Sequence, residues 1–428
     1  MAEPETPPGW RVTLTEQLNI TAHLVRWVVL GTAVGALSGL AGYVFLEGLD
    51  RVTSFRLDHG WLVWLLPAAG LVIGLAYHHL GGRAAQGNSL LIEEIHQPTT
   101  WVPRRMAPMV LIGSWITHLF GGSAGREGTA LQMSGSLADG LSRVIRLRPS
   151  DRRLLLIASL GGGFGAVFGV PLAGAVFALE VQAIGRVRYE ALVPALAASI
   201  VGDLVVGGLG YHHAPRAQVV AALTAGLVAK VAIAGVAFGV VGLTFTELAH
   251  RIQAVVGRVG WPPLRQVIGG IGIVGLFVLF GSDYLGLSLP LVDGALQGDR
   301  LGFAVFALKL VFTAVTLGCG LPGGEVTPLL VIGATLGAAL AAPLHLPVAL
   351  LAAVGYVAVF GGASNTPLAC TIMGAEIFGA GAVVPFAVGC VVAYVCSGHR
   401  SIYGTQRIAA GKGRIEVAGL PRVRDHRR

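Results

Sequence analysis

The sequence predicts an all-α polytopic membrane protein built from two related halves, and three observations support this prediction. Hydrophobic residues make up 54% of the 428 residues and charged residues only 12%, whereas a soluble domain carries about 25% charged residues. Several windows, of which 27–46 and 61–80 are the clearest, contain no Asp, Glu, Lys or Arg over the ~20 residues that a helix needs to cross a bilayer. Two short motifs also recur in the same order in each half of the chain.

Apolar stretches continue along the rest of the chain. Together they indicate roughly ten or more membrane segments, and Gly or Pro interrupts many of them before they reach the length of a simple span. The further stretches lie at 154–180, 191–206, 217–249, 267–281, 302–318, 326–344, 346–375 and 382–396. Interrupted segments of this kind are typical of discontinuous membrane helices.

Basic residues are concentrated in two places, which predicts the orientation in the membrane. The net charge is +8, with five arginines between residues 143 and 153 and a basic tail at 410–428. Because Lys and Arg are enriched on the cytoplasmic side of membrane proteins, we expect the arginine loop, the tail and an N-terminal segment 1–24 to be cytoplasmic. Nucleic-acid binding is the competing interpretation, but beside a membrane core these charges favour orientation and contact with anionic lipid.

An internal repeat divides the membrane region into expected halves at 25–212 and 217–409. The motif GREGT at 125–129 resembles GGEVT at 323–327, an offset of 198 residues. The motif PLA at 171–173, followed by Glu180, resembles PLA at 367–369, followed by Glu376, an offset of 196 residues. Inverted-topology halves are usual in secondary transporters and place the substrate site where broken helices meet at the membrane midplane. We therefore expect two inverted repeats, joined through residues 211–215.

A glycine-rich stretch at 121–129 is the most informative candidate site. A charge-free, helix-compatible run follows it at 130–137. A turn that feeds a helix in this way directs free N–H groups and the positive end of the helix dipole at one place, which suits an anion. Glu127 brings a carboxylate there, so it can compete with a bound anion when ionised and leave when protonated. The alternative is that Glu127 only stabilises the helix start, but an ionisable residue inside a membrane favours a functional role.

These motifs resemble those of the CLC family of chloride channels and antiporters. The sequence GREG at 125–128 resembles the gating-glutamate motif of that family, and GGEVTP at 323–328 resembles the start of its second anion-binding helix. Residues 87–89 (GNS) lie where the family has its first anion-binding loop, and Tyr403 falls where it places a tyrosine hydroxyl on the central anion. The resemblance spans about residues 25–410 and implies the CLC fold, with broken helices that meet at a midplane anion site.

The same resemblance implies roles for individual residues. Glu127 is implied as the gating and proton-carrying glutamate. The implied anion-binding residues are Asn88, Ser89, Gly125, Arg126, Gly128, Val326, Thr327 and Tyr403.

Departures from the chloride-type pattern are similar to the fluoride-exporting branch of the family. Asn88 stands in place of a serine, Thr129 in place of a proline and Val326 in place of a phenylalanine. Val181 occupies the position of an internal proton-transfer glutamate, which that branch does without. The resemblance therefore implies a fluoride/proton antiporter of the bacterial inner membrane that works without a cofactor. It also implies a homodimer with one pore per subunit.

The chemistry of fluoride agrees with this pattern. Removing water from a small, strongly hydrated anion is costly, so compensation needs compact donors. The Asn88 amide, the hydroxyls of Ser89, Thr327 and Tyr403, and backbone N–H groups are donors of this kind. Fluoride is also a weak base, which suits coupling to a proton on Glu127. Taken singly, the Ser89 and Thr327 hydroxyls could equally bond back to their own helices.

Three other functions remain open at this point. Chloride/proton exchange on the same fold is the nearest, and a passive anion channel is another, because CLC channels keep the gating glutamate. An intramembrane metalloenzyme could use Glu93 and His96, which have the spacing of half a di-iron site, but no second Glu-x-x-His accompanies them. We therefore expect a secondary active transporter rather than an enzyme, and no metal.

Other ionisable residues within apolar segments are expected to be structural. We expect Glu180, Glu325 and Glu376 to be buried and hydrogen-bonded. Lys230 and Lys309 are expected either to pair with an acidic neighbour or to extend to an interface.

Overall fold

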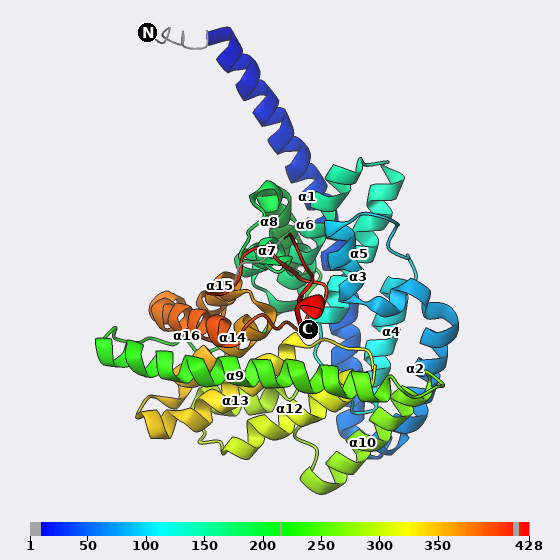
Figure 1. Ribbon diagram of the computed structural model, residues 1–428, viewed down its shortest axis with the longest axis vertical. Coiled ribbons are helices and arrows are strands. Elements are labelled where there is room, and N and C mark those ends of the chain that lie inside the picture. Colours follow the sequence, from blue (N-terminus) through cyan, green and yellow to red (C-terminus); the bar gives the residue numbers. More distant parts are fainter. Residues whose placement is uncertain (1–9, 215, 414–418, 428) are drawn as a thin grey trace.

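Helices make up almost all of the regular structure in this computed structural model, which describes residues 10–214, 216–413 and 419–427 (Figure 1). The helices of the first half are α1 (Trp10–Asp58), α2 (Leu66–Ala76), α3 (Asn88–His96), α4 (Met106–Leu119), α5 (Glu127–Val144), α6 (Pro149–Phe168), α7 (Pro171–Glu180) and α8 (Leu192–Gly208). Those of the second half are α9 (Ala225–Val256), α10 (Leu264–Phe280), α11 (Leu289–Gln297), α12 (Phe303–Gly318), α13 (Val326–Leu344), α14 (Val348–Ser364), α15 (Pro367–Phe378) and α16 (Val383–Cys396).

Short elements complete the description. A π-helical turn lies at Tyr77–Gly81, and short 3-10 helices lie at Gly60–Leu65, Gly82–Gln86, Tyr189–Ala191, Ala380–Ala382 and Val423–Arg427. The described strands are β1 (Ala183–Ile184) and β2 (Arg407–Ile408), which pair in parallel.

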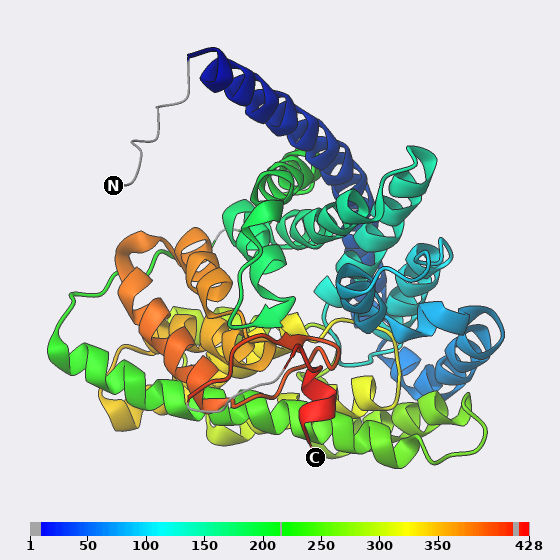
Figure 2. The same cartoon turned by 45° about the horizontal axis from the view of Figure 1, so that its top comes forward.

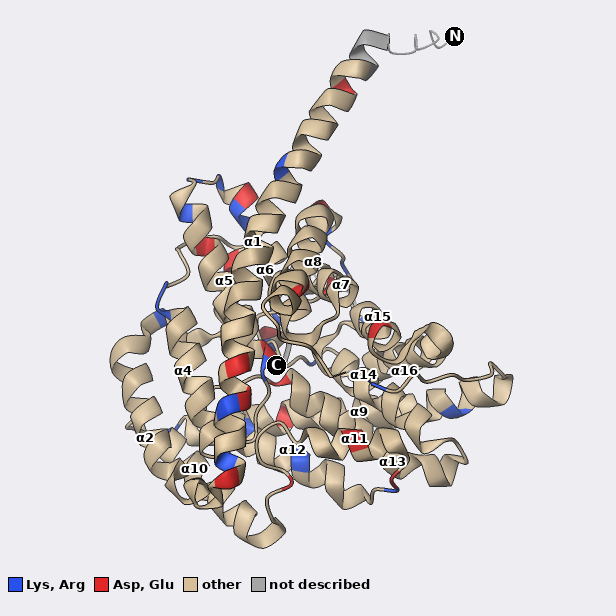
Figure 3. Ribbon diagram, turned by 180° about the vertical axis from the view of Figure 1, so that it is seen from behind, with Lys and Arg blue, Asp and Glu red and all other residues tan. Residues whose placement is uncertain are grey.

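The helices fit a membrane environment. Five helical stretches in the described residues have the length and composition to cross a membrane, and seven further apolar helices are shorter. The five are Leu14–Asp58, Gly60–His96, Tyr189–Gly208, Ala225–Val256 and Val326–Leu344. Figure 3 shows that most of the helical ribbon carries no charged residue. The predicted all-α polytopic protein, with many segments too short for simple spans, is confirmed.

The first helix begins earlier than the expected boundary at residue 25. α1 runs without a break from Trp10 to Asp58, and its N-terminal turns project from the body of the molecule (Figures 1 and 2). The expected cytoplasmic segment 1–24 is thus helical from residue 10, and residues 1–9 lie outside the described part of the chain. Residue 215 of the expected linker and residues 414–418 and 428 of the expected tail also lie outside it.

Each half contains a helix that stops and restarts at the same motif. Gly169, with a φ of 69°, caps the C-terminus of α6, and Pro171 begins α7. Asn365, with a φ of 60°, caps the C-terminus of α14, and Pro367 begins α15. A left-handed residue ends a helix, and proline is compatible with the first turn of the next one because that turn needs no N–H bond. The two PLA motifs of the sequence are therefore helix starts.

The glutamates that follow these motifs bind the opposite half. The Glu180 carboxylate accepts hydrogen bonds from the N–H groups of Leu368 (3.1 Å) and Ala369 (2.9 Å), in the first turn of α15. In reverse, the Glu376 carboxylate accepts from the first turn of α7, at 2.9 and 2.8 Å. Each acidic side chain satisfies N–H groups that a helix start leaves free. The expected hydrogen bonding of Glu180 and Glu376 is confirmed.

Glycine allows the closest helix crossing in the core. A Cβ atom added at Gly333 of α13 would meet the carbonyl oxygen of Gly355 of α14 at 2.0 Å, and one at Gly355 would meet that of Gly333 at 2.1 Å. Small residues permit such approaches between membrane helices. Since α13 is also among the most buried helices, it forms a central support for the residues at its N-terminal end.

Residues 404–413 and 419–427, together called the C-terminal arm below, fold back onto the protein. The arm contains β2, and Val423 N donates to the Gln406 carbonyl oxygen at 2.8 Å. The Glu93 carboxylate pairs with Arg407 (3.1 Å) and Arg422 (2.5 Å). Part of the tail predicted from its positive charge is thus held by an internal carboxylate.

Candidate anion and proton site

The two motifs related by the 198-residue offset meet in space. Gly125 N donates to the Gly324 carbonyl oxygen at 2.7 Å, and Gly324 N donates to that of Gly125 at 2.8 Å. This antiparallel bridge lies directly before the first residues of α5 and α13. A Cβ at Gly324 would come within 2.9 Å of Glu127 N, so this approach needs glycine. The bridge places two helix starts, with their free N–H groups, beside each other.

Glu127 occupies the space between these helix starts. Its carboxylate accepts hydrogen bonds from Thr327 N at 3.0 Å, from the Thr327 hydroxyl and from Arg126 N at 3.1 Å. The Arg126 guanidinium lies 3.8 Å from the same carboxylate. Glu127 is completely buried. An acidic side chain therefore takes the place to which both helix starts direct positive charge.

Asn88 approaches the same place from α3, and Ser89 is the next residue of that helix. Gly87, with a φ of 57°, precedes this helix, and Asn88 is its first residue. The Asn88 amide nitrogen lies 3.2 Å from where a Cβ of Gly128 would stand, so the amide packs against the first turn of α5. Asn88 Oδ1 is buried and has no hydrogen-bond partner in the described part of the chain.

Tyr403 completes the group on the side of the C-terminal arm. A cavity of about 410 Å³ is lined by Asn88, Ser89, Glu325 and Tyr403, and Arg424 of the arm lies on its wall. We call it the Tyr403 cavity. The Thr405 hydroxyl donates to the Ser89 carbonyl oxygen at 3.0 Å, which ties the Tyr403 segment to α3.

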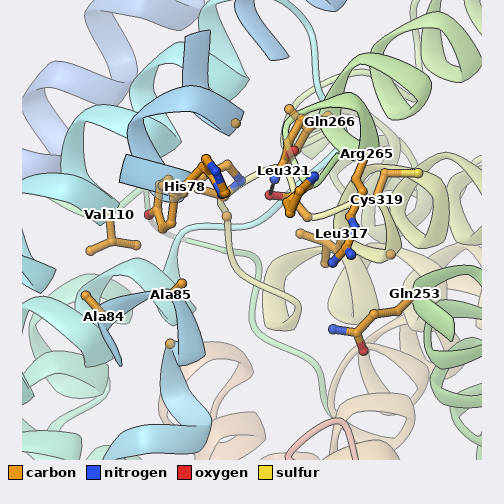
Figure 4. Close-up of a pocket in the computed structure, with 18 of the residues that line it drawn as sticks. His78, Ala84, Ala85, Val110, Gln253, Arg265, Gln266, Leu317, Cys319 and Leu321 are labelled. Atoms are coloured by element: carbon orange, nitrogen blue, oxygen red, sulfur yellow. Dashed lines mark hydrogen bonds between the residues drawn. The ribbon is translucent and has the colours of Figure 1, made fainter. Parts of the chain in front are cut away.

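A second cavity of about 520 Å³ adjoins the first (Figure 4). In Figure 4, His78 lies on one side of it, and Arg265 and Gln266 lie on the other. Glu325 and Gln253 line both cavities. The Glu325 carboxylate has no hydrogen bond within the described residues, so the expectation that it would be hydrogen-bonded is wrong. It lines cavity space instead.

A third cavity has a volume of about 450 Å³. It is called the Arg126 cavity, and Asp50, Arg126, Tyr211, His213 and Glu376 are among its lining residues. The Arg126 and Tyr403 cavities share no lining residue. Glu127, the residue after Arg126, is among the lining residues of neither cavity.

Histidine and tyrosine at the Arg126 cavity belong to the linker between the halves. Burial lowers the pKa of His213 to about 4, and the Arg126 charge acts in the same direction. Burial also raises the pKa of Tyr211. Both side chains are thus neutral at pH 7. The charged residues of the cavity wall are Arg126, Arg216, Asp50 and Glu376.

The predicted site residues lie together. Gly125 forms the bridge, Arg126 and Gly128 flank Glu127 in sequence, and Val326 is the buried first residue of α13 beside Thr327. Asn88, Ser89 and Tyr403 line one cavity. The grouping arises because the bridge unites the two helix starts and the arm returns the C-terminal chain to α3.

The partners of Lys309 differ from those predicted. Its ammonium group is fully buried in α12 and donates to the hydroxyls of Ser123 (2.9 Å) and Ser288 (2.9 Å) and to the carbonyl oxygens of Tyr284 (3.2 Å) and Gly286 (2.8 Å). The expected acidic partner or extension to an interface is wrong, because loop oxygens provide these acceptors. Lys230 Nζ lies 3.5 Å from the His345 carbonyl oxygen.

The acidic residues that follow Asn88 have structural partners. Glu94 is buried and pairs with Arg83 (2.8 Å) and Arg152 (3.3 Å). Arg152, expected in a basic loop, lies instead in α6 and also pairs with Asp139 at 2.5 Å. The described residues contain no group of three or more His, Cys, Asp or Glu side chains that could hold a metal ion.

Helix starts from two halves that face one buried carboxylate are typical of membrane transport proteins for small ions. The family model described as "voltage gated chloride channel" matches residues 69–398. The chain belongs to this CLC family.

Individual relatives refine the comparison. A chloride/fluoride channel protein of Pseudomonas syringae pv. tomato is 47% identical over 412 residues, covering 93% of this chain and 90% of the relative. An H(+)/Cl(-) exchange transporter of Yersinia pestis is 28% identical over 340 residues, covering 73% and 70%. The crystal structure of a CLC-type fluoride/proton antiporter matches with a TM-score of 0.87 at 34% identity, covering 90% of this chain and 98% of that one. A slow cyanobacterial Cl-/H+ antiporter shares the fold, with a TM-score of 0.79 at 20% identity over 88% of this chain and 96% of that one.

Proposed function

We propose that this protein is a fluoride/proton antiporter in which Glu127 is both gate and proton carrier. The observation that supports the proposal most directly is the position of the Glu127 carboxylate. It is buried between the starts of α5 and α13 and accepts hydrogen bonds that could equally serve a small anion. A group that competes for an anion site and also binds a proton provides a physical link between the two ions.

The proposed cycle begins with Glu127 ionised and the pathway closed. When a proton binds to the carboxylate, its negative charge is lost and it becomes a weaker acceptor for Thr327 and Arg126. The side chain then leaves, and fluoride accepts the hydrogen bonds from Thr327 N, the Thr327 hydroxyl and Arg126 N. Glu127 carries its proton to the opposite cavity and releases it there. Fluoride leaves the cell as protons enter.

The remaining anion contacts are proposed from the surroundings of this position. Asn88, Ser89 and Tyr403 line the Tyr403 cavity and would accompany the anion on that side. Backbone groups of Gly125, Gly128 and Val326 would stabilise it at the helix starts. Compact N–H and O–H donors suit fluoride because its hydration shell must be replaced at short range.

We propose fluoride over chloride as the transported anion on two grounds. The relative that is 47% identical is named as a chloride/fluoride channel protein, and the matched structure at 34% identity is described as a fluoride/proton antiporter. Asn88, Thr129 and Val326 also depart from the chloride-type pattern. Chloride/proton exchange is the second candidate, and the exchange transporter relatives favour it at lower identity.

The proposal extends to assembly and location. CLC membership supports a homodimer with one pore per subunit in the bacterial inner membrane, surrounded by lipid. The arginines between residues 143 and 153 and the C-terminal arm support cytoplasmic termini.

Ion flux from liposomes tests the substrate. Purified protein reconstituted with fluoride on both sides and a proton gradient is expected to move fluoride against its own gradient, as recorded with a fluoride electrode. Chloride movement that is faster than fluoride movement would contradict the fluoride assignment. Fluoride flow without proton movement would favour a passive channel.

The variant Glu127→Gln tests the gate. The amide cannot take up and release a proton, so we expect proton-coupled flux to be abolished, as measured by the pH change outside the liposomes. Glu190→Gln is the matched control, because Glu190 is exposed and its ion pair within the described residues is with nearby Arg188. Unchanged proton flux in Glu127→Gln would remove Glu127 from its proposed role.

A further inference from the structure

We propose that Lys412, in the C-terminal arm, is a positioning residue that holds the Tyr403 segment against the anion pathway. Its ammonium group is connected through Asn365 to residues 400–406, which carry Tyr403 and contact Ser89. The inference rests on the proposed function, since Tyr403 and Ser89 contact the anion only under that proposal.

Lys412 reaches the ends of two helices at once. Nζ donates to the Tyr394 carbonyl oxygen (2.6 Å) and the Ser397 hydroxyl (3.1 Å) at the end of α16, and to Asn365 Oδ1 at the end of α14. The Tyr394 ring centre lies 3.8 Å from the same nitrogen. Helix C-termini and aromatic faces both attract a cation. These groups favour the charged form of Lys412 and oppose the effect of burial, which lowers its pKa to about 7.

The partners of Lys412 are all acceptors. The Ser397 hydroxyl donates its own hydrogen to the Tyr394 carbonyl oxygen at 2.9 Å, so it accepts from Lys412. An ammonium group has three N–H donors and no acceptor, which matches three acceptors. The ion pairs formed within the described residues include no carboxylate bound to Lys412. The hydrogen bonds of its ammonium group therefore go to the C-terminal ends of α14 and α16.

Asn365 transmits this contact to the Tyr403 segment. It is buried, and its amide nitrogen donates to the Arg400 carbonyl oxygen at 2.8 Å and to Gln406 Oε1 at 3.0 Å. Because Oδ1 accepts from Lys412, the amide has one satisfied orientation, and a flip would place its NH2 group against the ammonium. Lys412 therefore fixes the direction in which Asn365 holds residues 400 and 406.

The held segment leads directly to the pathway. Ile402 N donates to the Ala363 carbonyl oxygen at 3.0 Å, and Gln406 N donates to that of Tyr403 at 2.9 Å. The Thr405 hydroxyl binds the Ser89 carbonyl oxygen at 3.0 Å. A shift of residues 400–406 would move both Tyr403 and Ser89 in the wall of the Tyr403 cavity.

The first test compares transport constants. Lys412→Met keeps the aliphatic stem and removes the donors, so the KM for fluoride is expected to rise by about 3- to 10-fold, the scale of a small misplacement of binding groups. The maximal rate should change less than the KM. In Lys412→Arg, the KM should lie close to the wild-type value. Lys230→Met is the matched control, because Lys230 Nζ has a single long contact at an exposed site. An unchanged KM in Lys412→Met would overturn the proposal, and so would a fall in thermal stability without a KM change.

The second test asks whether Lys412 acts through Tyr403. In a Tyr403→Phe background, Lys412→Met is expected to add little to the KM, whereas fully additive effects would overturn the proposal. Hydrogen exchange at residues 402–406 should be faster in Lys412→Met than in the wild type, and equal exchange would also overturn it. If the wild type transports chloride and not fluoride, the proposed substrate is wrong. The same variant series, measured with chloride, then still decides the role of Lys412.

Discussion

Thr327 gives Glu127 two hydrogen bonds from one residue, through its backbone N–H and its hydroxyl. The N–H group belongs to the first turn of α13, where no helical acceptor is available. The hydroxyl adds a donor that the backbone cannot provide. Together they hold a carboxylate at a point where the helix start already favours negative charge.

The variant Thr327→Val tests the hydroxyl at nearly constant side-chain volume. A hydrogen bond to a charged group contributes about 1.5–3 kcal/mol. Its loss should lower the equilibrium constant for the closed position of Glu127 by about 10- to 100-fold. We expect a loss of proton-coupled fluoride efflux of about tenfold or more, measured as the initial rate under a proton gradient. Thr327→Ser keeps the hydroxyl and should stay within about threefold of the wild type. Equal rates in the Val and Ser variants would contradict this account.

At the scale of elements, the helix breaks in the two halves support each other. The first turn of α7 donates hydrogen bonds to Glu376 near the end of α15. The first turn of α15 donates hydrogen bonds to Glu180 at the end of α7. A short helix with a proline start cannot satisfy its own first N–H groups, so each one depends on the other half of the chain. The exchange of caps makes α7 and α15 one unit.

Glu180→Ala should loosen this unit. It leaves two N–H groups of α15 without acceptors, at a cost of about 1–3 kcal/mol for each buried group. We expect a lower unfolding temperature in detergent, and a smaller loss in Glu180→Gln, which keeps one acceptor oxygen. Glu47→Ala, which removes a more exposed pair with Arg51 on α1, is the control and should cost at most about 1 kcal/mol. Similar losses in Glu180→Ala and Glu47→Ala would show that the cap contributes little.

For the whole molecule, the linker between the halves is held at the Arg126 cavity. The His213 ring lies over Gly169, at the break between α6 and α7, with ring atoms 2.5 to 3.3 Å from where a Cβ would stand. Its Nε2 also lies 3.2 Å from the Ala166 carbonyl oxygen. The linker thus packs on the same broken helix whose second part Glu376 caps.

This packing should depend on pH. Burial and Arg126 lower the pKa of His213 from 6.5 to about 4, so the unfolded chain binds a proton between these values and the folded chain does not. The contribution of His213 is complete above pH 6.5 and is lost as the pH falls to about 4. The wild type should therefore lose more thermal stability than His213→Asn between pH 7 and 4.5. The control His212→Asn, at the exposed neighbouring residue, should lose as much thermal stability between these pH values as the wild type. Equal losses in the wild type and His213→Asn would contradict the role given to His213.

Much of this architecture could be predicted from residue patterns, since membrane helices and repeats are recorded in local composition. Charge-free windows such as 27–46 and 61–80 indicated the membrane class, and the 196- and 198-residue offsets indicated two halves. The partners of Lys309 are an example of contacts that residue patterns do not predict. A lysine in an apolar segment suggested a carboxylate partner, but its acceptors come from Ser123, Tyr284, Gly286 and Ser288, which only the folded chain brings together.

Apolar length, glycine spacing and isolated charges are properties of short segments, so the membrane class, the repeat and the motifs around Glu127 could be predicted from residue patterns. The contacts that these motifs make could not, because they depend on the folded chain. The Gly125–Gly324 bridge, the exchange of caps between Glu180 and Glu376, and the return of Lys412 to Asn365 each join residues far apart in the chain. Such contacts depend on how helices cross, and helix crossing follows from close packing of side chains and glycines across the whole molecule.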